Sequence, residues 1–158
     1  MTDAPIDPLV IIELTNLKAA GKLGELASHP QLGMKPEWIG ELAADKTWFV
    51  RCYLAQNAAT ANSSEGIQAL AADKDPDVRS SLAENPALAN FPEIIQALAT
   101  DEDWSVRWYL ASNPALANFP EIIQALASNP ATAKNPAVHT ASNNPWQPSQ
   151  PITPVPTI

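Results

Sequence analysis

Residues 73–86 read DKDPDVRSSLAENP, residues 101–114 read DEDWSVRWYLASNP, and residues 45–58 read DKTWFVRCYLAQNA. Each stretch has an aspartate first, then a Val-Arg pair, a Leu-Ala pair and an asparagine at matching positions. The three arginines of the chain, Arg51, Arg79 and Arg107, are therefore 28 residues apart. A fixed period of this length predicts a tandem array of one small structural unit.

The first half of each unit predicts one helix. It begins after Thr47, Asp75 or Asp103, which are good N-cap residues. A valine and a leucine at i and i+4 should form its buried stripe; the pairs are Val50/Leu54, Val78/Leu82 and Val106/Leu110. Asparagine tolerates the left-handed conformation that ends helices. We therefore expect these helices to stop at Asn57, Asn85 and Asn113. Loops should follow at residues 87–91 and 115–119.

The second half of each unit predicts another helix, starting at Pro36, Ser64, Pro92 or Pro120. An isoleucine and a leucine three residues apart lie on one helical face, which must be the buried one. These pairs are Ile39/Leu42, Ile67/Leu70, Ile95/Leu98 and Ile123/Leu126. A glutamate in the first turn suits the helix dipole and could add to an acidic ridge.

The helices are only about two to three turns long, and helices of this length do not persist alone in water. Their stability must come from stacking one repeat on the next. We therefore predict an all-α fold, a short α-solenoid of about four 28-residue helical repeats at residues 26–130. Residues 1–25 should form an N-terminal helical cap of one or two helices. Residues 131–142 should be a degenerate closing segment, and residues 143–158 an extended Pro-rich tail.

The pattern Asp-x-Asp-Pro-Asp-Val-Arg-x-x-Leu-Ala-x-Asn-Pro of residues 73–86 resembles the bacterial leucine-rich repeat variant family and the wider HEAT-like class. The resemblance covers about residues 26–130. It implies a right-handed solenoid whose first helix is short or 3₁₀-like. The period is longer than in that variant family. The chain also lacks the N-terminal cysteine group on which some members carry an iron–sulfur cluster, so no cofactor is expected.

The repeated aspartates and arginines predict a ladder, and in HEAT-like repeats the matching residues bond between successive units. A guanidinium offers five donors in a fixed fork, suited to a carboxylate and to exposed carbonyls. Six residues separate each aspartate from its arginine, too far for a pair on one helical face. The bond should therefore run across the loop or between repeats. The ladder consists of Asp45, Arg51, Asp73, Arg79, Asp101 and Arg107. Anion binding by the arginines is the alternative.

Aromatic residues on the first helices are the better functional lead. They are Trp48, Tyr53, Trp104, Trp108 and Tyr109. Trp108 lies about 200° round the helix from Val106, so we expect it to be the most exposed of the set. Exposed tryptophan and tyrosine clusters are typical anchors of protein interfaces. The alternative is that these rings fill gaps between short helices.

The C-terminal tail has prolines at 145, 148, 151 and 154, which share one ridge of a polyproline II helix. A neighbouring ridge is mostly apolar and includes Trp146, Ile152, Val155 and Ile158. We hypothesise a docking strap that lies in a groove of this protein, a sister copy or a partner. The alternative is a disordered tail.

Composition excludes several classes of function. The formal charge of −8 disfavours nucleic acid and anionic membranes and slightly favours a neutral or basic partner. Cys52 is the one cysteine, so no internal disulfide is expected, and it has no paired base motif. Neither His29 nor His139 has an acidic or cysteine neighbour at metal-ligand spacing. We expect no membrane span and no secretory signal, and hence a cytoplasmic protein or an intracellularly assembled particle.

These features together predict a non-enzymatic protein–protein interaction module, either an adaptor or a structural subunit of a larger assembly. A virion or injection-machine structural protein is one alternative within this class, favoured only by the tail. A HEAT-like enzyme such as a bilin lyase or a DNA glycosylase is another. A glycosylase would need a basic groove, and this chain is acidic.

Overall fold

The computed structural model describes residues 8–130 and residue 132, and within this part of the chain every regular element is a helix. The prediction of an all-α fold is confirmed. A short 3₁₀ helix, labelled η, follows every second α-helix. The elements are α1 (Pro8–Ala19), α2 (Leu23–Ala27), η1 (Leu32–Met34), α3 (Pro36–Ala43), α4 (Trp48–Gln56), η2 (Ala58–Asn62), α5 (Ser64–Ala71), α6 (Pro76–Ala83), η3 (Pro86–Asn90), α7 (Pro92–Ala99), α8 (Trp104–Ala111), η4 (Pro114–Asn118) and α9 (Pro120–Ser128).

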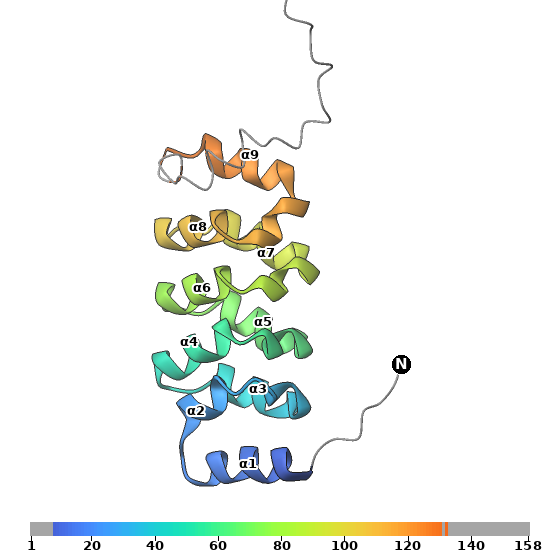
Figure 1. Ribbon diagram of the computed structural model, residues 1–158. Helices are drawn as coiled ribbons and strands as arrows, with labels where there is room; N and C mark the ends of the chain where they lie inside the picture. The colour runs from blue at the N-terminus through green and yellow to red at the C-terminus, as the bar shows by residue number, and fades with distance from the viewer. Residues whose placement is uncertain (1–7, 131, 133–158) are drawn as a thin grey trace, which may run out of the picture.

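The helices stack in successive layers from α1 at one end to α9 at the other (Figure 1). One column contains α2, α4, α6 and α8, each packed on the next. A second column contains α3, α5, α7 and α9, and the 3₁₀ helices η1 to η4 pack on one another in the same order. Each layer therefore has three sides, and its main contacts are with the layers directly before and after it.

The core runs along the stack between the columns. The valine–leucine pairs of α4, α6 and α8 are buried, as predicted, and so are the isoleucine–leucine pairs of α3, α5 and α7. In α9, Leu126 is buried, whereas Ile123 is only partly buried against the core. Full burial of a leucine or isoleucine side chain is worth roughly 1.5–3 kcal/mol, so the stacked pairs supply much of the stability that the short helices lack.

The segments after the first helices differ from the prediction. Residues 87–91 and 115–119 are not plain loops, because they contain most of η3 and η4. No described residue other than a glycine has a positive φ, so the asparagines do not end helices in the left-handed conformation. Asn57, Asn85 and Asn113 instead have extended backbones and cap the 3₁₀ helices with their side chains. The first helices themselves are α-helical, so the 3₁₀ character implied by the resemblance belongs to a third element of each layer.

These asparagines connect the layers. The amide nitrogen of Asn85 donates to the carbonyls of Ala55, at 2.7 Å, and Asn57, at 3.0 Å, which lie 30 and 28 residues earlier. Asn57 and Asn113 make the corresponding bonds, to Ala27 and His29 and to Ala83 and Asn85. An extended backbone at this position points the amide at the previous layer, which a left-handed helix end would not do.

The N-terminal region consists of α1 and α2, the larger number of helices expected there. The domain boundary expected between residues 25 and 26 falls inside α2 (Leu23–Ala27). The carbonyl of Ala27 accepts from Asn57 just as that of Ala55 accepts from Asn85, so α2 occupies a first-helix position. The described helices include none with the length and apolarity needed to span a bilayer.

The predicted closing segment and Pro-rich tail, residues 131–142 and 143–158, lie outside the described residues apart from Thr132. The strap hypothesis and its residues, Trp146, Ile152, Val155 and Ile158, therefore stay predictions.

Candidate functional site

The ladder joins the first helices α4 and α6 to the loops of the layers that follow them. Arg51 on α4 donates from Nε and Nη2 to the two carboxylate oxygens of Asp73, at 2.6 and 3.0 Å. Its Nη1 donates to the backbone carbonyl of Asp45, at 2.7 Å. The Asp73 carboxylate also accepts from the backbone N–H of Asp75, at 2.9 Å, which holds the loop before α6. The spacing left open a bond across the loop and a bond between repeats, and the Arg51 side chain makes both.

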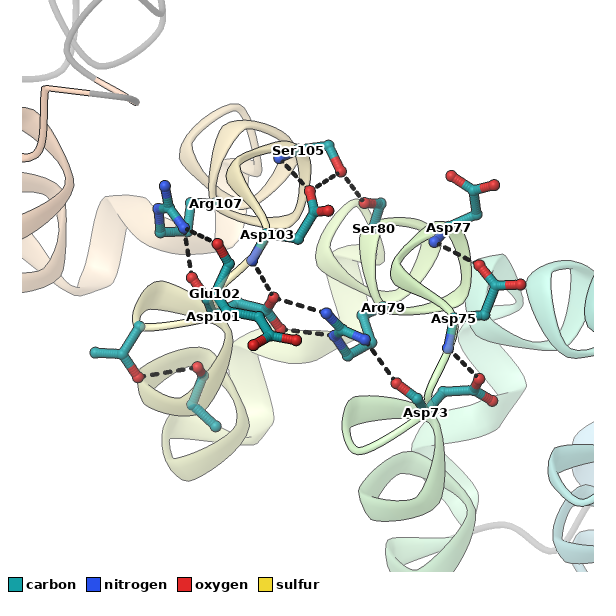
Figure 2. Close-up of polar contacts among 12 residues, drawn as sticks. Asp73, Asp75, Asp77, Arg79, Ser80, Asp101, Glu102, Asp103, Ser105 and Arg107 are labelled. Atoms are coloured by element: carbon teal, nitrogen blue, oxygen red, sulfur yellow. Dashed lines mark hydrogen bonds and ion pairs between the residues drawn. The ribbon is translucent and has the colours of Figure 1, made fainter.

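The same arrangement recurs one layer further on (Figure 2). Arg79 donates to the two oxygens of Asp101, at 2.7 and 2.9 Å, and to the carbonyl of Asp73, at 2.7 Å. Both ion pairs are nearly inaccessible to water. The hydrogen bonds with the aspartates raise the pKa of Arg51 and of Arg79. The two guanidinium groups are already bonded to carboxylates. This arrangement indicates that they hold the layers together, and it disfavours binding of an external anion by them.

The ladder changes at its last arginine. Arg107 donates from Nη1 to the carbonyls of Asp101 and Glu102, as Figure 2 shows. The residue 28 positions after Asp101 is Asn129, so the next layer offers an amide where the others offer a carboxylate. Nε of Arg107 is buried and has no hydrogen-bond partner within the described part of the chain. A buried donor of this kind typically costs about 1–3 kcal/mol.

Large rings lie exposed on α4 and α8. Trp104 is the most exposed of the predicted set, at 59%, followed by Trp48, Tyr53 and Tyr109 at 50%, 48% and 40%. The structure adds Phe49, which is 47% exposed. Its ring meets those of Trp48 and Tyr53 edge-on, with centroids 6.4 Å apart in both pairs. Phe49 was not predicted from the sequence, because the equivalent positions of the other repeats are Asp77 and Ser105. Its spacing of four residues from Tyr53 could have indicated that the two rings lie on the same face of the helix.

The prediction that Trp108 would be the most exposed ring is wrong. Trp108 is partly buried and packs edge-on against Trp104, with ring centroids 6.3 Å apart. The equivalent position in α6 is Ser80, a buried residue whose hydroxyl bonds to Ser105 of α8, at 3.1 Å. This position faces the neighbouring layer. A helix in a stack is covered on its sides as well as on its core face, so an angle measured from Val106 alone does not predict exposure.

A groove lies across α4, α6 and α8, with a volume of about 340 Å³. Tyr53 and Tyr109 stand at its two ends, and between them α6 has a serine, Ser81, at the equivalent position. The groove is lined by Trp48, Phe49, Cys52, Tyr53, Gln56, Asp77, Ser80, Ser81, Glu84 and Tyr109. It therefore combines exposed aromatic rings with two carboxylates and small hydroxyl side chains, and it brings Trp48, Tyr53 and Tyr109 of the predicted set together. Trp104 and Trp108 are not part of its lining.

Cys52 lies in this groove. Burial raises the pKa of its thiol, a hydrogen bond with Ser81 acts in the opposite direction, and the negative charges of Asp75 and Asp77 raise the pKa further. A raised pKa disfavours the thiolate, which is the nucleophilic and metal-binding form of cysteine. In the described part of the chain no three or more histidine, cysteine or acidic side chains gather as a metal site would require. The rings, carboxylates and hydroxyl groups that line the groove can make non-covalent contacts with a ligand.

Comparison with known proteins adds no relative. No protein-family model matches the sequence, and neither the curated proteins nor the solved structures contain a significant match. The resemblance to leucine-rich repeat variant and HEAT-like proteins thus stays a prediction, and the site must be interpreted from its own geometry.

Proposed function

We propose that this protein is a non-enzymatic protein–protein interaction module, an adaptor or a structural subunit, that binds its partner in the groove across α4, α6 and α8. We further propose that its scaffold is a right-handed α-solenoid of about four repeats. The recurrence of the asparagine bonds at a separation of 28 residues supports a repeating unit of that length.

The observation that carries the proposal is the group of exposed rings at the groove. Trp48, Phe49, Tyr53 and Tyr109 are each 40% or more exposed, and all four line the same concavity. Aromatic side chains lose little conformational entropy on binding and bury a large area, so they are the typical anchors of interfaces. The core does not need these rings, since the valines and leucines of α4 and α8 already fill it.

The scaffold supports this function because it holds the groove in shape. The ion pairs of Arg51 and Arg79 and the amide bonds of the asparagines tie together the layers whose helices line the groove. A preformed surface avoids part of the ordering cost of association, so more of the contact energy goes into affinity. The raised pKa of the Cys52 thiol supports a binding role rather than nucleophilic catalysis.

A random-peptide display library tests the proposal. Peptides selected on the wild-type protein should bind the double variant Tyr53→Ala/Tyr109→Ala at least about tenfold more weakly, because truncating an interface anchor typically costs 1–2 kcal/mol or more. Leu9→Ala/Ile12→Ala is the matched control, since these side chains are also exposed but lie on α1, away from the groove.

Affinities would be measured by calorimetry, with circular dichroism to show that each variant is folded. Selected peptides that bind both double variants as tightly as the wild type would contradict the assignment of the groove as the binding site.

A further inference from the structure

One position of the helices that line the groove differs in size between neighbouring layers. Residues 53, 81 and 109 are equivalent, and they are tyrosine, serine and tyrosine. Because α6 packs directly between α4 and α8, Ser81 leaves space between the rings of Tyr53 and Tyr109. The small side chain of Ser81 therefore contributes to the concavity.

The side of this space that α6 forms is acidic. Asp77 and Glu84 lie four residues before and three residues after Ser81, so all three share one face of α6. Both carboxylates are exposed and line the groove. Among the described residues, neither is paired with a lysine, arginine or histidine.

No lysine or arginine lines the groove. Cys52 also lines the groove, and the pKa of its thiol is raised by burial and, in addition, by the negative charges of Asp75 and Asp77. Two exposed carboxylates next to aromatic rings are a complementary environment for a cation, because a ring face attracts it and the carboxylates accept its hydrogen bonds.

We propose that the groove binds a basic side chain, arginine or lysine, of the partner protein, with its charged end at Asp77 and Glu84 and its stem against Tyr53 and Tyr109. This inference rests on the proposed function and specifies the chemistry of the partner. A basic side chain suits the site on two counts: its aliphatic stem covers apolar ring surface, and its head pairs with carboxylates that would otherwise face only water.

The probe for the test is a short capped peptide of alternating glycine and arginine, and its counterpart has citrulline in place of arginine. Citrulline has nearly the same shape as arginine and no charge. Binding would be followed by amide NMR at physiological salt. The arginine peptide should shift the amide signals of Tyr53, Ser81 and Tyr109 in a saturable way, and the citrulline peptide should bind at least about tenfold more weakly.

Two variants locate the effect. Asp77→Asn/Glu84→Gln should weaken binding of the arginine peptide about tenfold or more. The matched control is Glu93→Gln/Glu121→Gln, which changes the net charge equally but alters exposed carboxylates on α7 and α9, and it should leave binding nearly unchanged. Ser81→Tyr should abolish binding by filling the groove, and it should fold, because tyrosine occupies the equivalent positions of α4 and α8.

Three results would overturn the inference: equal affinity for the citrulline peptide, equal losses in the two charge variants, or signal shifts that map away from the groove. If uncharged display-selected peptides bind the groove and depend on Tyr53 and Tyr109, while the arginine peptide does not bind, the proposed function stands and only the cationic partner is rejected.

Discussion

At the scale of single residues, the layers are joined by side chains that replace backbone hydrogen bonds. Arg79 satisfies the carboxylate of one layer and the loop carbonyl of another, and Asn85 satisfies two carbonyls of the previous layer. A stack of helices has no ladder of backbone bonds between elements, unlike a sheet. Buried polar groups at the layer boundaries must therefore be bonded by side chains, or they destabilise the fold.

The last rung of the ladder gives a sharp prediction at this scale. Asn129→Asp should complete the pair with Arg107, whose Nε is buried without a partner in the described part of the chain. We expect a gain of roughly 1–2 kcal/mol, because the guanidinium is already desolvated and only gains an acceptor. This corresponds to a rise in Tm of about 3–6 °C, measurable by calorimetry.

Two controls isolate the new pair. Asn129→Ser offers no carboxylate and should not raise Tm. In the Asn129→Asp background, Arg107→Ala should remove the gain, so the double-mutant cycle should show a coupling energy of roughly 1–2 kcal/mol. An unchanged Tm in Asn129→Asp would mean that the side chain at 129 does not reach Arg107.

At the scale of elements, α6 and α8 each begin with an aspartate whose side chain caps the helix, whereas Thr47 at the start of α4 makes no side-chain cap bond. Asp103 caps α8 by accepting from the backbone N–H of Ser105, at 2.8 Å, and from its hydroxyl, at 2.6 Å. The Ser105 bonds lower the pKa of Asp103. A carboxyl group whose pKa is lowered by folding stabilises the protein above its unfolded pKa of about 3.9, and this contribution is lost as the pH falls through the lower, folded value.

Ser105→Ala should therefore move the pKa of Asp103 up towards its ordinary value, because the hydroxyl bond is its largest cause of lowering. The stabilisation that Asp103 contributes above its unfolded pKa should then be smaller, and its loss on acidification should be complete at a higher pH. Carbon NMR of the Asp103 carboxyl group measures the shift directly. Ser80→Ala is the control: it removes the Ser80–Ser105 bond but keeps both bonds to Asp103, and it should leave that pKa unchanged. A pKa that does not move in Ser105→Ala would refute this account of the cap.

At the scale of the whole molecule, we expect the stack to behave as a nearly one-dimensional assembly. Each helix of a column packs on the preceding and following ones, so an inner layer is stabilised from both sides. The helix α1 lies at one end of the stack and packs mainly on α2 (Figure 1). In such an array stability is approximately a sum of intrinsic and nearest-neighbour terms.

Hydrogen exchange under native conditions should therefore be graded along the stack. The inner amides of α4 and α6 should be the most protected, and those of α1 should exchange through local opening of lower free energy. Mass spectrometry of exchanged peptides would measure the gradient. Uniform protection from α1 to α8 would show that the molecule opens only as one cooperative unit and would contradict the additive description.

The local sequence predicted much of the fold, because the residues that determine each helix lie close together along the chain and recur in each repeat. The caps at Asp75 and Asp103 and the buried valine–leucine pairs depend only on local bonds and on periods of three to four residues. Thr47 also precedes a helix, as predicted, but its side chain makes no cap bond. The bond from Arg79 to an aspartate of another layer was also open to prediction, since a fixed period implies a fixed partner. The asparagines were misinterpreted because a helix end and a 3₁₀ cap have the same local sequence.

The candidate site was predicted only in part. Trp48, Tyr53 and Tyr109 were identified from the sequence, whereas Trp108 was placed wrongly and Phe49, Asp77 and Glu84 were missed as members of the groove. Exposure and concavity depend on which side chains of neighbouring layers face one another, and that is set by packing. The amino-acid sequence alone determined the helical period, the helix starts and the buried stripes, because these follow from interactions within a turn or two of the chain. Only the tertiary structure decided which rings remain uncovered and that they enclose an acidic groove, because residues 28 positions apart come together only when the layers stack.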